Sequence, residues 1–225
     1  DMFYDEAKKE SYLIAIDSLV KQMELQPRTD EGGFWHKKIY PWQMWLDGLY
    51  MASPFLAEYG EVMNESSYFD EVIHQIKLMD THSYDKQMGL FYHAWDESRE
   101  QKWADKETGR SPNFWSRSIG WYALALVDVL DFLPTDYKGR EYILDVIERV
   151  ADGISRWQDE KTGVWFQLTA LGDKEGNYLE SSGSSMFVAF LYKAINKGYL
   201  TDIKYKTVAD KGFYGLINEF IRLEE

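Results

Sequence analysis

Apolar residues recur every three or four positions along most of the chain, a spacing that places them on one face of an α-helix. The pattern predicts helices near residues 5–25, 42–59, 66–82, 115–133, 139–157, 183–197 and 203–223. No long run alternates between apolar and polar residues, as a half-buried strand would. The sequence therefore predicts an all-α protein, folded as a single domain over residues 1–225.

The predicted helices are of two kinds. The helices near 42–59, 115–133 and 183–197 are apolar or small on nearly all sides, which is typical of helices buried on both faces. The other four carry many charges beside a regular apolar stripe, so each should have one face in water. Because the two kinds alternate, we expect an inner ring of adjacent, roughly parallel helices inside an outer ring that runs antiparallel to it.

A short aromatic phrase occurs three times, at residues 32–36, 89–93 and 163–167. Each copy starts with glycine, follows an acidic turn and precedes a predicted inner helix, so the chain contains an internal repeat. Each copy is predicted to be a small strand or an extended loop. The repeat gives His36, His93 and Gln167 equivalent positions, where we expect them to converge over one mouth of the ring.

A lone carboxylate, Asp47, lies in the otherwise apolar and aromatic run from Trp42 to Tyr50. Burial of an unpaired carboxylate favours its protonated form, and a carboxylic acid that is protonated at neutral pH can act as a general acid. The adjacent Gly48 would allow another group to approach closely. A purely structural role, in which Asp47 caps or hydrogen-bonds a neighbouring loop, explains the pattern equally well.

Arg117 and Trp121 are four residues apart, so they share one face of the predicted helix 115–133. A guanidinium can hold a carboxylate with two hydrogen bonds, and an indole offers a flat surface for a sugar ring. A surface salt bridge for Arg117 and a core position for Trp121 would explain the same spacing. For His36 and His93, hydrogen bonding, proton transfer and a satisfied core position are all open.

Composition narrows the class of partner. The net charge of −13 argues against nucleic acids and membrane surfaces, while aromatic residues, at 16% and including nine Trp, suit both core packing and sugar stacking. Without cysteine, and with four dispersed His, the chain has no disulfide, thiolate nucleophile or zinc motif. No metal or cofactor is implied.

No signal peptide or apolar run of membrane-spanning length is present in the sequence. Because the chain begins at Asp1, we expect its natural N-terminus to be missing. Both the cytoplasm and the periplasm therefore remain open as locations.

Taken together, these motifs resemble the unsaturated rhamnogalacturonyl hydrolases of glycoside hydrolase family 105, which are related to the unsaturated glucuronyl hydrolases of family 88. The resemblance covers almost the whole chain and rests on the segments 27–38, 43–52, 89–97, 111–123 and 176–180. It implies a six-fold double-ring α/α barrel, in agreement with the two kinds of helix.

The resemblance also implies a site and a reaction. Asp47 matches the family's general acid/base, while His36, His93, Arg117 and Trp121 match residues that line the subsite for the unsaturated uronic acid. The family hydrates the C4=C5 double bond of a 4,5-unsaturated galacturonyl residue on a rhamnogalacturonan oligosaccharide. The resulting hemiketal opens and releases the rest of the sugar, so one protonating aspartate is sufficient.

The chain departs from the family in length. Seven helices are predicted where the full barrel has twelve, and the segment that carries another active-site aspartate would precede Asp1. We therefore expect an incomplete ring with apolar inner helices exposed. Two alternatives follow: an unsaturated glucuronyl hydrolase acting on another polysaccharide, and a non-catalytic carbohydrate-binding remnant of the same fold. A terpene-cyclase-like barrel lacks support because the sequence has no Asp-rich metal motif.

Overall fold

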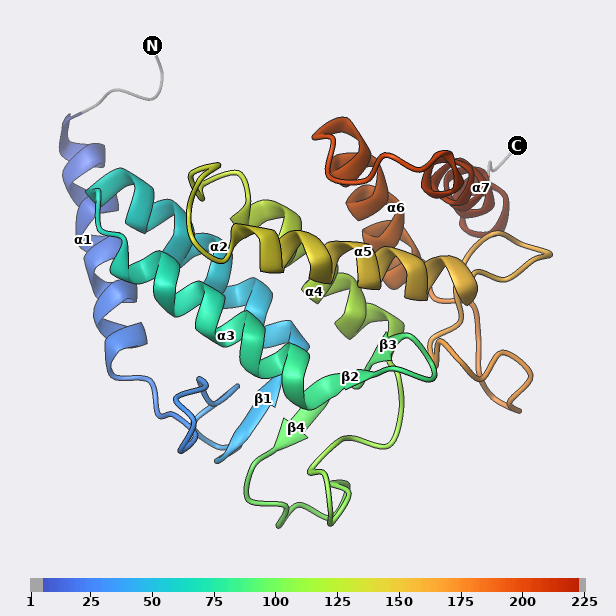
Figure 1. Cartoon of the computed structure of the whole chain (residues 1–225), viewed down its shortest axis with the longest axis horizontal. Helices are drawn as coiled ribbons and strands as arrows, with labels where there is room; N and C mark the ends of the chain where they lie inside the picture. The colour runs from blue at the N-terminus through green and yellow to red at the C-terminus, as the bar shows by residue number, and fades with distance from the viewer. Residues whose placement is uncertain (1–5, 223–225) are drawn as a thin grey trace.

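The computed structural model describes residues 6–222, so the predicted boundaries at residues 1, 5, 223 and 225 lie outside the described part. It is dominated by helices, as predicted (Figure 1). The helices are α1 Glu6–Glu24, α2 Leu46–Met63, α3 Ser67–Ser83, α4 Ser116–Val129, α5 Arg140–Arg156, α6 Ser181–Asn196 and α7 Ile203–Phe220. The strands are β1 Gln43–Trp45, β2 Tyr84–Asp85, β3 Leu90–Phe91 and β4 Ala94–Asp96.

The predicted inner helices are adjacent and run in the same direction. Helix α4 packs against α2 on one side and α6 on the other. Between α2 and α4, Asp47 meets Ser118 and, one turn later, Tyr50 meets Trp121; in both pairs the partners are 71 positions apart. A constant offset along two helices requires that they be parallel and in register.

Helix α6 continues the inner layer. Ser116 at the start of α4 lies against Gly183, and Gly120, one turn further, lies against Met186. Near the C-terminal ends of both helices, Lys193 forms an ion pair with Asp128 at 2.7 Å. Residue numbers rise together along this contact, so α4 and α6 are also parallel.

The outer helices α3 and α5 run the opposite way. The short connection 64–66 reverses the chain between α2 and α3. Asp70 near the start of α3 accepts a hydrogen bond from Tyr137 just before α5, and Asp80 near its end pairs with Arg149, so α3 and α5 are parallel to each other. Helices α1 and α7 lie at opposite edges of the array, and α7 is seen almost end-on in Figure 1.

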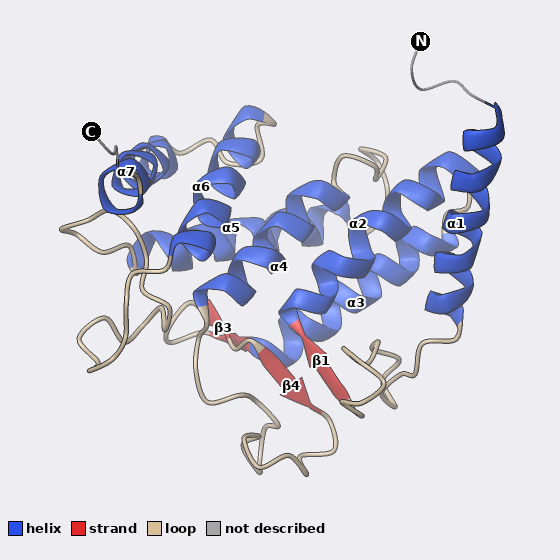
Figure 2. Ribbon diagram, turned by 180° about the vertical axis from the view of Figure 1, so that it is seen from behind, coloured by secondary structure: helices blue, strands red, loops and turns tan. Residues whose placement is uncertain are grey.

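The starts of the inner helices are tied together by the aromatic phrases. The backbone N–H of Leu46, the first residue of α2, donates to the carbonyl of His93, and the N–H of Ser116, the first residue of α4, donates to that of Gln167. The first glycine of each phrase, at positions 32, 89 and 163, has a positive φ. The repeat is therefore structural, and it places the N-terminal ends of α2 and α4 at the same end of the array, beside the strands in Figure 2.

The predicted start of the first inner helix, at residue 42, is wrong by four residues. Trp42 has a φ of 64°, a left-handed conformation that no α-helix contains. Residues Gln43–Trp45 form β1, which pairs antiparallel with β4. The pairing with β4 keeps these residues extended although their side chains have helical spacing. As a result, Asp47 lies in the first turn of α2.

The core is continuous between the two layers, and its aromatic members include Phe91, Tyr122, Trp165, Phe187 and Tyr205. The expectation of widely exposed inner helices is only partly right. Exposed large apolar side chains on α2 are Met51, Val62 and Met63, but within residues 6–222 most lie on the edge helices, among them Tyr12, Leu13, Ile14, Phe213 and Tyr214.

We predict that Gly153→Ala destabilises the protein by about 1–3 kcal/mol. Helix propensity alone would favour alanine in α5 by roughly 1 kcal/mol, but a Cβ at this position would lie 2.0 Å from the backbone carbonyl oxygen of Gly89. Because that oxygen belongs to a bonded turn, the clash outweighs the propensity. Urea unfolding measures the change, and Glu148→Ala on the exposed face of α5 is the control. A Gly153→Ala protein as stable as the control would contradict the close contact.

Candidate active site

Asp47 is half-buried at the N-terminal end of α2. The hydroxyl of Ser118, itself buried in the first turn of α4, donates a hydrogen bond to its carboxylate. The expectation of an unpaired carboxylate in an apolar helix is therefore wrong. The reason is the displaced helix start, since Trp42 lies outside the helix and the carboxylate lies where two helix N-termini meet.

His36 lies on the other side of α2's first turn. Its ring stacks on that of Trp45, with centroids 4.7 Å apart and an interplanar angle of 5°, and Tyr40 extends the stack. Its Nδ1 is buried, has no hydrogen-bond partner and lies 3.2 Å from where a Cβ on Gly48 would be. Gly48 therefore lets the imidazole approach the helix closely, as its position in the sequence predicted.

His93 stands edge-on to the same Trp45, with ring centroids 5.7 Å apart. Its Nδ1 lies 3.3 Å from the carbonyl oxygen of Asn113. A carbonyl only accepts, so Nδ1 carries the proton and, in the neutral ring, Nε2 keeps a free lone pair. The indole of Trp45 thus separates two imidazoles that both lie near Asp47.

Burial lowers the pKa of His36 and of His93, and the negative charge of Asp47 opposes that shift in both. Lys37 adds a smaller lowering effect on the pKa of His36. With pKa values below the usual 6.5, both rings are largely neutral at pH 7. They can then donate or accept hydrogen bonds without placing a second charge beside Asp47.

Arg117 lies in the first turn of α4, partly exposed, with its guanidinium over the ring of Trp115 at 4.7 Å from the centroid. Its Nη1 lies 4.0 Å from the carboxylate of Glu180, a separation that is too long for a direct hydrogen bond. Its Nε is buried without a partner. The guanidinium therefore retains donors that a bound anion could use.

Glu180 caps α6. Its side chain accepts from the backbone N–H of Gly183 and, at 2.6 Å, from the hydroxyl of Ser182. These two contacts account for the carboxylate of Glu180. Glu180 also provides a negative charge that faces Arg117 across the start of the inner helices.

Trp121 is half-buried and packs against Tyr50 at 4.7 Å between ring centroids. The guanidinium of Arg117 lies over the ring of Trp115, two residues before it, and the shared role of Arg117 and Trp121 in holding a uronate stays a prediction. Trp121 instead lies one turn beyond Ser118, beside the turn of α2 that follows Asp47. Neither Trp115 nor Trp45 was singled out from the sequence, although both are aromatic residues immediately before an inner helix.

Of the three equivalent phrase ends, only two meet at this place. His36 and His93 lie on either side of Trp45, whereas the amide of Gln167 bonds to the hydroxyl of Tyr178 in the loop before α6. The expected convergence is therefore right for the two histidines alone. Gln167 lies instead at the start of α4, where its backbone carbonyl accepts the N–H of Ser116.

A cavity of about 430 Å³ opens beside the site, between α1 and α2. His36, Trp45 and Gly48 form the wall that it shares with the site, and Trp35 and Gln75 also line it. Within residues 6–222, no group of three or more His, Asp or Glu side chains is arranged to hold a metal ion. None of the described helices combines the length and apolarity required to cross a membrane.

Comparison with known proteins gives the family. The family model described as Glycosyl Hydrolase Family 88 matches residues 2–225. The solved structure of a family 105 glycoside hydrolase from C. acetobutylicum ATCC 824 superimposes with a TM-score of 0.93 at 43% identity, over 98% of this chain and 61% of that one. The double-ring α/α-barrel architecture predicted from the helices is thereby confirmed, and this chain forms part of it.

Three curated relatives are similar in sequence. Protein Atu3128 of Agrobacterium fabrum is 35% identical over 72% of this chain and 68% of its own length. The unsaturated 3S-rhamnoglycuronyl hydrolase of Formosa agariphila is 33% identical, over 80% of this chain and 47% of the relative. The unsaturated rhamnogalacturonyl hydrolase YesR of Bacillus subtilis is 30% identical, over 71% and 44%. The chain thus spans less than half of each named hydrolase.

The lowered pKa values predict a pH dependence of stability. Between the folded-state pKa and the ordinary value of about 6.5, the unfolded chain binds protons that the folded protein does not, so the free energy of unfolding falls as pH falls through this window. We expect His93→Gln to flatten that slope. Urea unfolding at a series of pH values measures it. His74→Gln, at an exposed position, is the control, and equal slopes for the wild type and His93→Gln would contradict the burial effect.

Proposed function

The chain belongs to glycosyl hydrolase family 88, and from that premise we propose that it acts on a sugar that ends in a 4,5-unsaturated uronic acid. The observation that carries this proposal is the meeting of Asp47, His36, His93 and Arg117 at the N-terminal ends of α2 and α4. A carboxyl group for proton transfer and a guanidinium for the uronate are the two groups that such a substrate requires.

The proposed reaction is hydration of the C4=C5 double bond. Asp47 delivers a proton to C4, and water adds its hydroxyl at C5 while its remaining proton returns to the carboxylate. The hemiketal formed at C5 then opens, and the bond to the next sugar breaks. The Ser118 hydroxyl, which bonds the carboxylate of Asp47, fixes the orientation from which the proton leaves.

Binding of the uronate is assigned to the surrounding side chains. Arg117 is held by Trp115 and keeps a donor free, so it can form charge-assisted hydrogen bonds to the uronate carboxylate. The neutral imidazoles of His36 and His93 supply donors or acceptors for hydroxyls. Trp121 supplies an aromatic surface one turn above Ser118.

We propose rhamnogalacturonan oligosaccharides as the substrate and 4,5-unsaturated galacturonic acid as the sugar released. The similarity to the Bacillus subtilis rhamnogalacturonyl hydrolase and to the family 105 structure supports this choice. An unsaturated glucuronyl or rhamnoglycuronyl substrate is the second candidate, which the similarity to the Formosa agariphila enzyme favours. A carbohydrate-binding protein without catalysis is the third.

Loss of ultraviolet absorbance tests all three candidates at once, because hydration removes the conjugated double bond. Lyase-treated rhamnogalacturonan, and separately a lyase-treated glucuronan, are incubated with the protein and the absorbance is followed. Loss with the first substrate alone supports the proposal. Loss with the second alone favours the second candidate, and binding of either without loss favours the third.

We predict that Asp47→Asn reduces kcat by roughly a thousand-fold or more while the unsaturated disaccharide still binds, because asparagine keeps the shape but cannot donate an acidic proton. Turnover and calorimetric binding are measured on the same preparation. Asp145→Asn, an exposed position on α5, is the control for the charge change. A fall of less than about ten-fold, worth about 1.4 kcal/mol of barrier, would mean that another residue is the acid.

Arg117→Ala should raise KM far more for a substrate with a free uronate carboxylate than for its methyl ester. The charge-assisted contact that is lost is worth on the order of 2–4 kcal/mol, and the ester cannot make it fully. KM is measured for both substrates with the wild type and the variant. Equal increases for acid and ester would show that Arg117 does not contact the carboxylate.

A further inference from the structure

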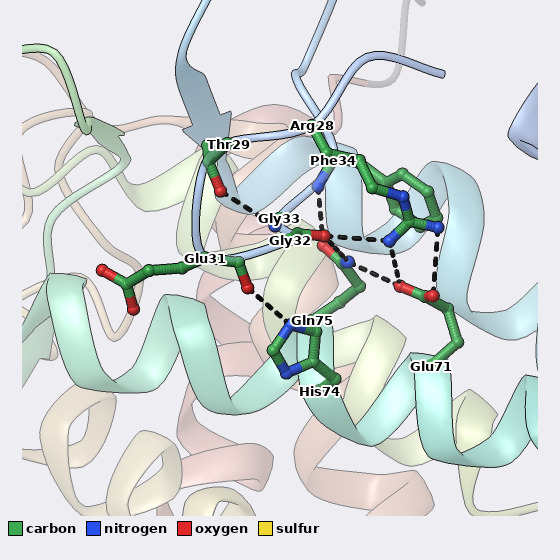
Figure 3. A network of polar contacts seen from close by, with 9 residues as sticks. All are labelled: Arg28, Thr29, Glu31, Gly32, Gly33, Phe34, Glu71, His74 and Gln75. Atoms are coloured by element: carbon green, nitrogen blue, oxygen red, sulfur yellow. Dashed lines mark hydrogen bonds and ion pairs between the residues drawn. The ribbon is translucent and has the colours of Figure 1, made fainter. Parts of the chain in front are cut away.

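The first aromatic phrase is held in place by polar side chains of α3 (Figure 3). Gln75, only 2% exposed, accepts a hydrogen bond from the backbone N–H of Phe34 at 2.9 Å. The amide nitrogen of Gln75 donates to the carbonyl of Gly32 at 3.0 Å and to the carboxylate of Glu71 at 2.6 Å. The buried side chain of Gln75 thus forms hydrogen bonds with two backbone groups of the phrase, the N–H of Phe34 and the carbonyl of Gly32.

Arg28 contacts both Glu71 and the same phrase. Its guanidinium forms two hydrogen bonds with Glu71, at 2.8 and 3.0 Å, and a third with the carbonyl of Gly32 at 2.9 Å. It also lies 4.2 Å from the centroid of the Phe34 ring. We call Arg28, Glu71 and Gln75 the α3 clamp, because their hydrogen bonds connect α3 with residues 28–34 through Arg28–Glu71 and through Gln75 to Gly32 and Phe34.

The other two phrases are held in part by close backbone contacts with their outer helices. Helix α5 meets the second phrase at Gly153, where a Cβ would lie 2.0 Å from the carbonyl oxygen of Gly89. Helix α7 meets the turn before the third phrase at Gly215, where a Cβ would lie 2.3 Å from the carbonyl oxygen of Thr162. Side chains add bonds there too, from Trp157 to the carbonyl of Met88 at 3.0 Å and from Gln158 to the carbonyl of Gly163 at 2.7 Å. The first phrase differs in that a buried side chain within its outer helix, Gln75, bonds two of its backbone groups.

The phrase that the clamp holds ends at His36, two residues after Phe34. On the far side, the N–H of His36 donates to the carbonyl of Gln43 at 2.7 Å, and Gly33 packs closely against Met44. His36 is therefore held from two sides, by α3 through the backbone of residues 32–34 and by β1 through its own N–H. Its closeness to Gly48 and its stacking on Trp45 depend on both supports.

We propose that the α3 clamp, with Gln75 at its centre, is a positioning unit that sets the imidazole of His36 against Asp47 and Trp45. Its importance for catalysis rests on the proposed function, but its effect on His36 does not. The hydrogen bonds of Gln75 go to Gly32, Phe34 and Glu71, so it acts on His36 through the backbone of residues 32–36. Glu71 and Gln75 of the clamp lie on an outer helix, where the sequence pattern predicts only packing.

The test follows the titration of His36 and His93 by NMR of their ring protons, with His36→Asn and His93→Asn variants to assign the signals. The charges nearest His36 are those of Asp47 and Lys37, and neither is changed. In Gln75→Met the volume is retained and the three hydrogen bonds are lost. We expect the pKa of His36 to rise toward its ordinary value of about 6.5 as its burial is lost, while that of His93 stays unchanged.

A matched control separates positioning from general destabilisation. Arg28→Met removes two hydrogen bonds to Glu71 and one to the carbonyl of Gly32, and Arg149→Met removes a comparable pair to Asp80 further along α3. Arg28→Met should move the His36 titration, and Arg149→Met should lower the melting temperature without moving it. In protein that turns over the disaccharide, we expect the two clamp variants to raise KM about ten-fold with a smaller change in kcat, as loss of a binding contact does.

The NMR titration of His36 and His93 decides the proposal, and no turnover measurement is needed. A shift of His36 alone in both clamp variants supports it. An unchanged His36, or equal shifts of His36 and His93, overturns it. If both clamp variants fail to fold while Arg149→Met folds, the clamp is a folding element and the proposal is also overturned. If the protein hydrolyses no unsaturated sugar, the proposed function fails, and the titration still tests the clamp.

Discussion

Parallel, in-register packing of α2 against α4 is the constraint on which the rest of the structure depends. The register brings Ser118 to the carboxylate of Asp47 and, one turn later, Trp121 to Tyr50. A shift of one residue in either helix would rotate its side chain by about 100°, since a turn contains 3.6 residues. The carboxylate would then lose its hydroxyl partner, and the aromatic contact above it would be lost in the same step.

The aromatic phrases hold that register at the ends of the helices. Each of the last two phrases accepts, at its final carbonyl, the N–H of the first residue of an inner helix, namely Leu46 and Ser116. Two parallel helices cannot be joined by a short turn, so their starts are aligned by these extended segments and by the pairing of β1 with β4. Functional side chains collect at this end because helix N-termini and phrase ends occur there together.

The architecture was predictable because it follows from side-chain periodicity, which the sequence displays directly. Helix α5, for example, begins and ends within one residue of the prediction. The start of α2 was not predictable, because the turn at Trp42 and strand β1 depend on a partner strand some 50 residues later. The error changed the surroundings of Asp47 from an apolar helix interior to a helix N-terminus.

The common location of the candidate residues was predictable from the sequence, but their neighbours were not. His36, His93, Asp47 and Arg117 lie at the same end of the array, yet Arg117 rests on Trp115, since its side chain leans back toward the start of its own helix. Ser118 and Gln75 were missed for different reasons. Serine at a helix start is expected to be a cap, and a lone glutamine on an amphipathic helix gives no periodic signal.

The central claim is that Asp47 lies where it can protonate C4 of an unsaturated uronate whose carboxylate is bound by Arg117. A crystal structure of the Asp47→Asn protein with an unsaturated disaccharide tests it most directly. We predict that C4 lies about 3–3.5 Å from the side chain of residue 47, the separation of a near-attack arrangement, with the carboxylate toward Arg117. A sugar bound with C4 beyond reach of residue 47, or held only in the cavity between α1 and α2, would contradict the account.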